Sequence, residues 1–210
     1  QTKAMDSAYW NTKFDTDDYI YTTVVNRFVR EYCEPLIAAQ PVGKMIDLAG
    51  GEGRNAVWFS EQGWQSENID FSKKALSKSL KLAEERGVGV LHFAHVADAT
   101  GFESVLTPVD IGVVAYLQVP KQSLAEALEN LTDNIRKGGH LLGVWHSLDN
   151  LADGYGGPRN AEVLPSVESL REICSELPLE IEFLGNRDGQ VQTKDGLKPS
   201  LTVVLLAKRR

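Results

Sequence analysis

The sequence predicts an α/β fold: a single Rossmann-like, doubly wound sheet with helices on both faces. Short apolar runs alternate with segments of helical periodicity over residues 44–146, and this pattern is typical of right-handed crossovers in a parallel sheet. A loop with three glycines, residues 50–53, follows the first apolar run. Two final strand candidates, residues 179–184 and 200–207, have no helix between them, so we expect them to be antiparallel.

The first half of the chain supplies strands and helices in turn. Residues 44–49 predict a buried strand, and residues 54–62 predict a short helix. Ser72 is expected to cap a second helix, which Gly87 ends. The apolar stripe of this helix is Leu76, Leu80 and Ala83. Residues 91–96 are a further strand candidate. The polar residues between these two helices do not predict a strand by themselves.

The second half continues the alternation and then departs from it. Residues 109–117 are apolar and β-branched, which predicts a central strand buried on both faces. A helix over residues 124–135 and a strand over residues 140–146 follow. Residues 147–165 are rich in Gly and Pro and lack periodicity, so we expect a lid or binding loop. Residues 166–177 predict a helix.

Length and charge limit the function classes. A chain of 210 residues is expected to form one domain, since domains average roughly 150 residues. The net charge of −7 disfavours a nucleic-acid partner, because an acidic surface repels phosphates. The longest apolar runs, residues 111–117 and 201–207, fall far short of the about 20 residues that cross a bilayer. We therefore expect no membrane partner.

The cysteines and the start of the chain bear on location. Cys33 and Cys174 are too few for a disulfide framework and lack metal-ligand spacing, so we expect reduced thiols, a cytoplasmic location and no metal site. Residues 1–3 contain no apolar signal core. The chain also starts without Met, which indicates a trimmed start.

The glycine loop is the candidate binding site. It joins a strand to the positive N-terminal end of a helix, which favours an anionic group. Residues 51–56 fit the dinucleotide pattern G-x-G-x-x-[G/A], and Asp70 follows Gly51 by 19 residues, close to the roughly 20 expected. However, Asp47 lies directly before the glycines. A pyrophosphate binds poorly beside an unpaired anion.

A cationic nucleoside without phosphate suits these acids better. S-adenosyl-L-methionine (SAM) carries an amino group and a sulfonium, which suit Asp47. Its ribose diol suits Asp70, because a carboxylate accepts two hydrogen bonds. Asp98, after the third strand candidate, is placed to accept from the adenine amino group. An NAD-linked Rossmann oxidoreductase and a non-catalytic SAM-binding protein remain as alternatives.

Several segments resemble class I SAM-dependent methyltransferases. The segments that carry this resemblance are DLAGGEG (47–53), IDFS (69–72) and ADA (97–99). Those that resemble the branch of tellurite-resistance and thiopurine methyltransferases are EGRNAVW (52–58), YWNTKF (9–14) and YIY (19–21). The resemblance implies seven strands with the last one antiparallel, and S-adenosyl-L-homocysteine (SAH) as product. It also implies that an N-terminal segment, residues 1–40, covers the cofactor on a core of residues 41–210.

The motifs and strand ends together give a set of expected cofactor contacts. This set is Trp10, Tyr21, Asp47, Ala49, Gly50, Gly51, Asn55, Asp70, Phe71, Asp98, Ala99, Ala115 and Tyr116. Ala49 departs from the family, which has glycine at this position. The side chains expected to roof the pocket are Trp10, Phe14, Tyr19 and Tyr21. An amphipathic helix packed on the core is the alternative explanation for these aromatic residues.

The acceptor is expected at the ends of the fourth and fifth strands. Tyr116 and Gln118 follow the fourth strand, and Trp145 and His146 end the fifth. Tyr116 and His146 are the candidate catalytic residues, with His146 as a general base; a hydrogen-bonded strand-end histidine is the alternative. The residues after the fourth strand, 115–120, lack the Asn/Asp-Pro-Pro-aromatic motif of adenine-N6 methyltransferases. We therefore expect methyl transfer to a small molecule by in-line displacement.

Overall fold

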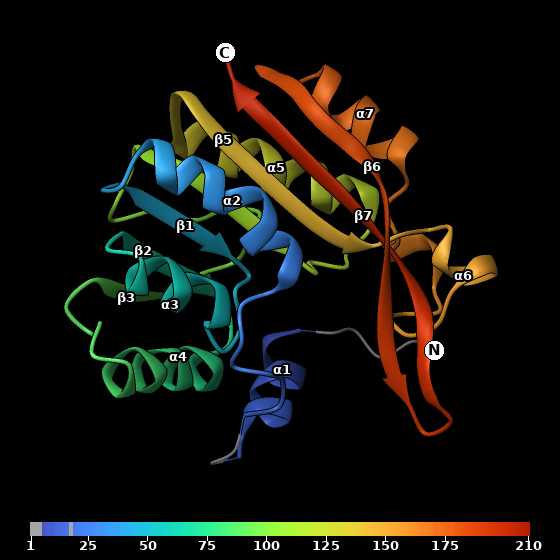
Figure 1. Ribbon diagram of the computed structural model, residues 1–210, viewed down its shortest axis with the longest axis horizontal. Helices are drawn as coiled ribbons and strands as arrows, with labels where there is room; N and C mark the ends of the chain where they lie inside the picture. Colours follow the sequence, from blue (N-terminus) through green and yellow to red (C-terminus); the bar gives the residue numbers. More distant parts are fainter. Residues whose placement is uncertain (1–5, 17–18) are drawn as a thin grey trace.

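A computed structural model describes residues 6–16 and 19–210 and shows a seven-stranded sheet with helices on both faces (Figure 1). The strands are β1 (Lys44–Leu48), β2 (Gln65–Asp70), β3 (His92–Val96), β4 (Val109–Ala115), β5 (Ile135–His146), β6 (Leu179–Thr193) and β7 (Gly196–Arg209). Their order is β3-β2-β1-β4-β5-β7-β6. Strands β1 to β5 pair in parallel, and β7 pairs antiparallel with both β5 and β6. The predicted fold class is confirmed.

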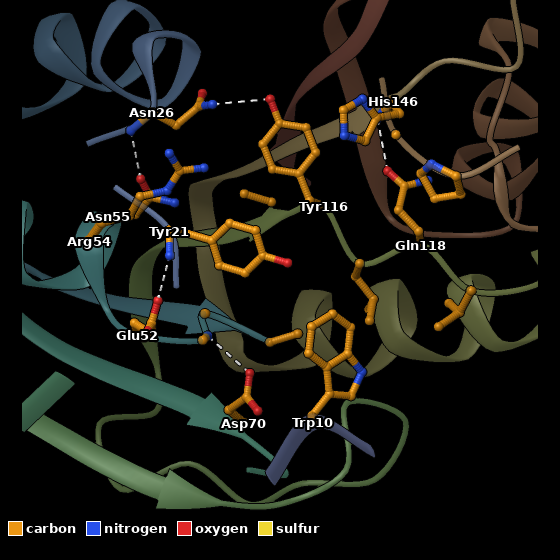
Figure 2. Close-up of a pocket in the computed structure, with 18 of the residues that line it drawn as sticks. Trp10, Tyr21, Asn26, Glu52, Arg54, Asn55, Asp70, Tyr116, Gln118 and His146 are labelled. Carbon is orange, nitrogen blue, oxygen red and sulfur yellow. Dashed lines mark hydrogen bonds between the residues drawn. The ribbon is translucent and has the colours of Figure 1, made fainter. Parts of the chain in front are cut away.

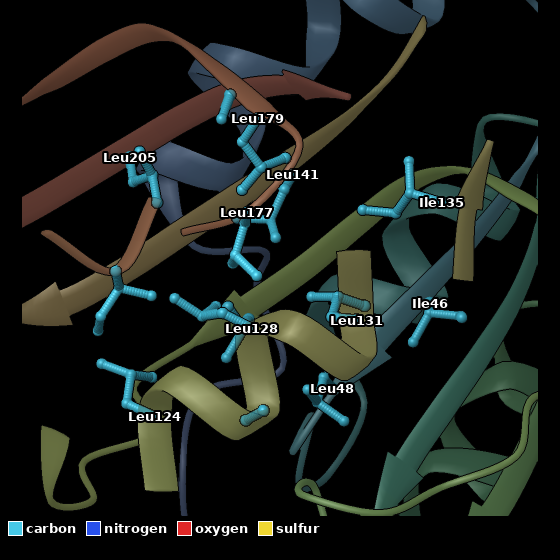
Figure 3. Close-up of a cluster of buried hydrophobic side chains, with 14 of the residues drawn as sticks. Ile46, Leu48, Leu124, Leu128, Leu131, Ile135, Leu141, Leu177, Leu179 and Leu205 are labelled. Atoms are coloured by element: carbon cyan, nitrogen blue, oxygen red, sulfur yellow. The ribbon is translucent and has the colours of Figure 1, made fainter. Parts of the chain in front are cut away.

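Helices cover both faces of this sheet. They are α1 (Ser7–Phe14), α2 (Arg27–Ala39), α3 (Arg54–Glu61), α4 (Lys73–Glu85), α5 (Lys121–Asn134), α6 (Asn150–Asp153) and α7 (Val167–Ser175), with a 3-10 turn η1 (Ala161–Val163). Met45 packs with α2 and α3 on one face, whereas its neighbour Ile46 packs with α5 and α7 on the other. Figure 3 shows the leucines of α5 against this second face. Because both faces are covered, the central strands are apolar on both sides.

Strand β2 is polar, and most of its side-chain polar groups have partners inside the molecule. The Ser66 hydroxyl lies 2.8 Å from Nδ1 of the buried His92. Glu67 is fully buried and accepts hydrogen bonds from the loop before β4, including the Val105 amide at 3.1 Å. The Asn68 amide donates to a carbonyl of the glycine loop at 2.9 Å. A polar strand is stable here because each of these groups has a partner.

Two local expectations were wrong. Leu80 was expected on the buried stripe of α4, but its side chain is 45% exposed and Leu82 is buried instead. The helix predicted over residues 124–135 ends at Asn134, and β5 begins at Ile135 rather than at His140. Ile135 already has extended backbone angles and is fully buried, as suits a β-branched residue in a strand.

Strands β6 and β7 form a hairpin that is longer than predicted. Their pairing runs from Leu179 opposite Arg209 to Thr193 opposite Gly196, whereas β5 pairs with β7 only as far as Thr202. The distal part of the hairpin therefore projects beyond the sheet (Figure 1). We call residues 187–201 the hairpin arm.

The loop over residues 147–165 lies against the hairpin arm. Asn150 accepts a hydrogen bond from the Leu201 amide at 2.7 Å, and the Tyr155 amide donates to the Pro199 carbonyl at 2.9 Å. The loop contains α6 and η1, although the sequence shows no helical periodicity there. The first five residues of the predicted N-terminal segment, and residues 17–18, lie outside the described residues.

Candidate functional site

A cleft of about 1760 Å³ lies at the carboxyl ends of the parallel strands. Its walls come from the loops after β1 to β5, from α1, from the start of α2 and from the hairpin arm. The predicted site residues that line it are Trp10, Tyr21, Ala49, Gly50, Gly51, Asn55, Asp70, Phe71, Asp98, Ala99, Ala115, Tyr116 and His146. The fold therefore gathers at one edge residues that are separated by up to 136 positions in sequence, where open α/β sheets bind ligands.

Asp47 is absent from the lining and lies beneath the glycine loop. It is fully buried, and neither carboxylate oxygen has a hydrogen-bond partner. Burial raises the pKa of Asp47 to about 7, and the nearby Asp70 adds to this effect, whereas the dipole of the Ala56 backbone amide and the charge of Arg54 oppose it. The side-chain oxygen of the buried Asn68 is also unpartnered. Two unpartnered acceptor groups therefore lie under Gly50, which is close to both.

Asp70 and Asp98 line the cleft as expected. Asp70 accepts the Gly51 amide at 3.0 Å and the Ser72 amide at 2.9 Å, one on each carboxylate oxygen. Burial raises the pKa of Asp70. Asp98 is exposed and accepts both the amide and the hydroxyl of Thr100 on one oxygen, which leaves the other oxygen free among the described residues. Since each carboxylate oxygen can accept two hydrogen bonds, both acids keep capacity for a ligand.

The glycine loop turns sharply at Ala49, the position at which the resemblance implied glycine. Ala49 has a φ of 55°, in the left-handed region that costs a residue with Cβ roughly 1–2 kcal/mol. Its amide donates to the Ile69 carbonyl at 2.7 Å, which holds the turn against β2. At Gly53 a Cβ would approach the Ser79 Cβ to 2.4 Å. The close contact between α3 and α4 therefore requires glycine at this position.

An N-terminal strap, residues 6–16 and 19–26, crosses one side of the cleft. The rings of Trp10 and Phe14 stack with centroids 5.6 Å apart, and Phe14 meets Tyr21 edge-on at 6.3 Å. Trp10 and Tyr21 face the cleft in Figure 2. Tyr19 was expected in this roof, but it is not among the lining residues, and its hydroxyl donates to the Lys78 carbonyl.

Glu52 fastens the strap to the glycine loop, a role that the sequence did not predict. Its buried carboxylate accepts the amides of Ile20 and Tyr21 at 3.0 Å and pairs with Lys78 at 3.0 Å. An acid between two loop glycines is a signal for such an anchor, because it is held close to whatever covers the loop. Figure 2 shows the bond to Tyr21.

A second attachment links the strap to the end of β4. The backbone amide of Asn26 donates to the side-chain oxygen of Asn55 at 2.9 Å. The Asn26 side chain donates to the Tyr116 hydroxyl at 3.2 Å and caps α2 through the Phe28 amide (Figure 2). Asn55 was expected to contact cofactor. Its oxygen instead holds the strap, although the residue also lines the cleft.

His146 and Tyr116 meet at the other side of the cleft. Their ring centroids are 4.8 Å apart, and Tyr116 has a φ of 62°. Nδ1 of His146 is buried without a partner, and burial lowers the pKa of this histidine. The His146 amide donates to the Gln118 side chain at 2.8 Å (Figure 2). The neutral imidazole is therefore the main form near pH 7.

Trp145 was expected beside His146, but it faces away from the cleft. Its side chain is fully buried in the core on the α5 side of the sheet, because successive residues of a strand point to opposite faces. Among the described residues, no group of three or more His, Cys, Asp or Glu is arranged to hold a metal ion. No helix in residues 6–16 and 19–210 has the length and apolarity of a membrane span.

The sheet order and the cleft define the fold of SAM-dependent methyltransferases, as comparison with solved structures shows. A structure from work on the conversion of a disulfide bond into a thioacetal group during echinomycin biosynthesis matches with a TM-score of 0.77, at 17% identity, over 98% of this chain and 92% of that one. TehB from Haemophilus influenzae matches with a TM-score of 0.70 at 15% identity, over 97% of this chain and 67% of TehB. Magnesium protoporphyrin IX methyltransferase (ChlM) from Synechocystis PCC 6803, with bound SAH, matches with a TM-score of 0.69 at 15% identity. This match covers 97% of this chain and 98% of ChlM.

A curated sequence relative points to the same enzyme class. It is tRNA 5-carboxymethoxyuridine methyltransferase of Escherichia coli (strain K12), 27% identical over 113 residues. This match covers 51% of the chain and 42% of the relative, so it spans less than half of that protein. No family model matches the chain. The comparisons show that the chain shares its fold with SAM-dependent methyltransferases, two of which have SAH bound.

Proposed function

We propose that the protein is a SAM-dependent methyltransferase that acts on a small molecule by in-line displacement. The observation that carries this proposal is the set of three acids at the ends of β1, β2 and β3. Within residues 6–16 and 19–210, none of these acids has a Lys, Arg or His hydrogen-bond partner. A cationic nucleoside fits them, because its amino group offsets the buried charge of Asp47 and its hydroxyls fit the spare capacity of Asp70. A dinucleotide pyrophosphate would meet these same negative charges.

The chain's own residues would position the reactants and exclude water. SAM supplies a methyl group that is already activated on a sulfonium, so the protein needs mainly to align it with the acceptor, an effect worth about 7–11 kcal/mol at best. Trp10 and Tyr21 of the strap would cover the cofactor, and Ala115 and Tyr116 would separate it from the acceptor. His146 would take a proton where the acceptor must lose one.

The charge of the cleft favours a small-molecule acceptor over tRNA. Its lining includes six acidic and three basic side chains, whereas RNA binding relies on Lys and Arg contacts to phosphates. The tRNA methyltransferase relative makes tRNA the second candidate. Methyl transfer to bulk tRNA that survives 200 mM salt would favour the second candidate and contradict the first.

Two finer assignments belong to this proposal. We place the chain near the tellurite-resistance and thiopurine branch, which the motifs of residues 9–14 and 52–58 and the likeness to TehB support. We also propose a cytoplasmic location, which is supported by Cys33 and Cys174, since both are buried free thiols.

Replacing Asp70 with Ala should weaken SAM binding by about 1–3 kcal/mol, because ribose hydroxyls would lose their acceptor. Isothermal calorimetry with SAM measures this loss. Glu180→Ala, an exposed acid on β6, is the matched control and should bind SAM as the wild type does. Equal affinity of the Asp70 variant would remove Asp70 from the site. Binding of NADH without binding of SAM would reject the whole proposal.

A further inference from the structure

The order of the strands divides the cleft into two halves. The loops after β1, β2 and β3, with the strap, carry the acids described above and form the cofactor half. The ends of β4 and β5, the start of α2 and the hairpin arm form the other half, which we call the acceptor half. Tyr116 lies between them, at the end of the strand next to β1.

The acceptor half has almost no charge of its own. Among its described lining residues, Arg27 and Asp188 are the ionised side chains, and they have opposite signs. Arg27 donates to the Asp188 carbonyl at 3.2 Å and stacks on Phe28. Arg187, also on the hairpin arm, is paired with Glu31. Arg27 has no ion-pair partner among the described residues, but Asp188 offsets its charge, so a carboxylate or phosphate of the acceptor would meet no net positive charge in this half.

The surface of the acceptor half is apolar and aromatic. Leu197 of the hairpin arm lines the cleft while its side chain is 60% exposed. Val191, Pro158 and Pro199 line the same wall. The rings of Tyr116 and His146 line the same half. A half lined by apolar side chains and two aromatic rings is suited to a flat aromatic body.

His146 gives this half a base without a competing anion. Its ring packs against Tyr116, and the uncharged Gly157 lies close to its Cγ, between Nδ1 and Cδ2. A thiol has a reference pKa of about 8.5 and partly ionises at neutral pH. A phenol has a reference pKa of about 10 and keeps its proton at neutral pH. A neutral imidazole in an uncharged pocket is therefore most useful to a phenolic acceptor.

Building on the proposed methyltransferase function, we propose that the acceptor is an uncharged aromatic hydroxyl compound that loses its proton to His146. In this reaction the sulfonium carbon–sulfur bond breaks as the oxygen–methyl bond forms. The oxygen–hydrogen bond breaks, and its proton passes to the imidazole and then to water. The products are an aryl methyl ether, SAH and one proton.

Two probes of matched shape test the acceptor class, 2-naphthol and 2-naphthoate. In the presence of SAH, calorimetry should show that naphthol binds at least tenfold more tightly than naphthoate. With SAM, mass spectrometry should detect 2-methoxynaphthalene. The inference is overturned if naphthoate binds equally well, if neither probe binds, or if naphthol binds without being methylated. Failure of SAH itself to bind would instead reject the proposed function.

Two variants test separately the role of His146 as a base and the role of Leu197 in binding the acceptor. His146→Gln should still bind naphthol, but its methylation rate should fall roughly 10²-fold or more, the usual contribution of a general base. The rate of this variant should no longer decrease at low pH. Leu197→Asp should weaken naphthol binding at least tenfold with SAH affinity unchanged. Leu80→Asp, at another exposed leucine on α4, should change neither affinity. A His146 variant within twofold of the wild-type rate would refute the base.

Discussion

Replacing Asp47 with Asn should stabilise the ligand-free protein at pH 8. The folded pKa of Asp47 is about 7 because of burial, whereas an unfolded aspartate titrates near 3.9. The folded protein therefore holds a proton that the unfolded chain releases between these values, so the free energy of unfolding falls as pH rises through this window. Three pKa units correspond to about 4 kcal/mol. Asn removes this charge penalty.

Urea unfolding at pH 4 and pH 8 measures the effect. The two proteins should differ little at pH 4, where Asp47 is largely neutral in the folded state, and the variant should gain up to about 4 kcal/mol at pH 8. A cofactor with an amino group should narrow the gap, because its positive charge offsets the buried carboxylate. A difference that is the same at both pH values would mean that Asp47 has no shifted pKa.

The parts of the fold that follow from periodicity could be predicted, and those that depend on tertiary partners could not. Val109, Ile111, Val113 and Val114 of the run predicted over 109–117 are buried as expected, as are the leucines of α5, whereas residues 115–117 are half-buried. Strand β2 was found only through its motif, because its polar side chains are stable only with partners such as His92 and the loop at Ser104. The hairpin arm contains turn-forming pairs, so local chemistry predicted a shorter hairpin.

In the candidate site, too, some features could be predicted from local sequence, and others depend on tertiary partners. The lining positions follow from strand ends, because parallel strands bring their carboxyl ends to one edge. Which face a strand-end residue points to depends on register, so Trp145 and His146 were not separated in advance. The depth of Asp47 and the role of Glu52 depend on how the strap covers the loop. These are contacts between distant segments that no local pattern encodes.

Replacing Gly50 with Ala should damage both the fold and SAM binding through steric contact alone. A Cβ at this position would lie 2.2 Å from the Asn68 side-chain oxygen and 2.6 Å from the Asp47 carboxylate. Neither can move freely, because both are fully buried and Asn68 also holds the glycine loop. Overpacking of this kind costs typically about 1–3 kcal/mol and sometimes more. The displaced loop should bind SAM at least tenfold more weakly.

Two other glycines make this test specific, because they separate crowding from backbone strain. Gly51 has a φ of 60°, but a Cβ there would make only an ordinary contact with Phe14 at 4.0 Å, so Gly51→Ala should cost only the roughly 1–2 kcal/mol of a left-handed residue. Gly101 has neither a positive φ nor a neighbour within 4 Å, so Gly101→Ala should match the wild type. Chemical denaturation and SAM calorimetry on all three variants give the ranking. If Gly50→Ala is no less stable than Gly101→Ala, the buried acceptor groups do not lie against the loop, and the account of Asp47 as an anchor for a cationic ligand is lost with them.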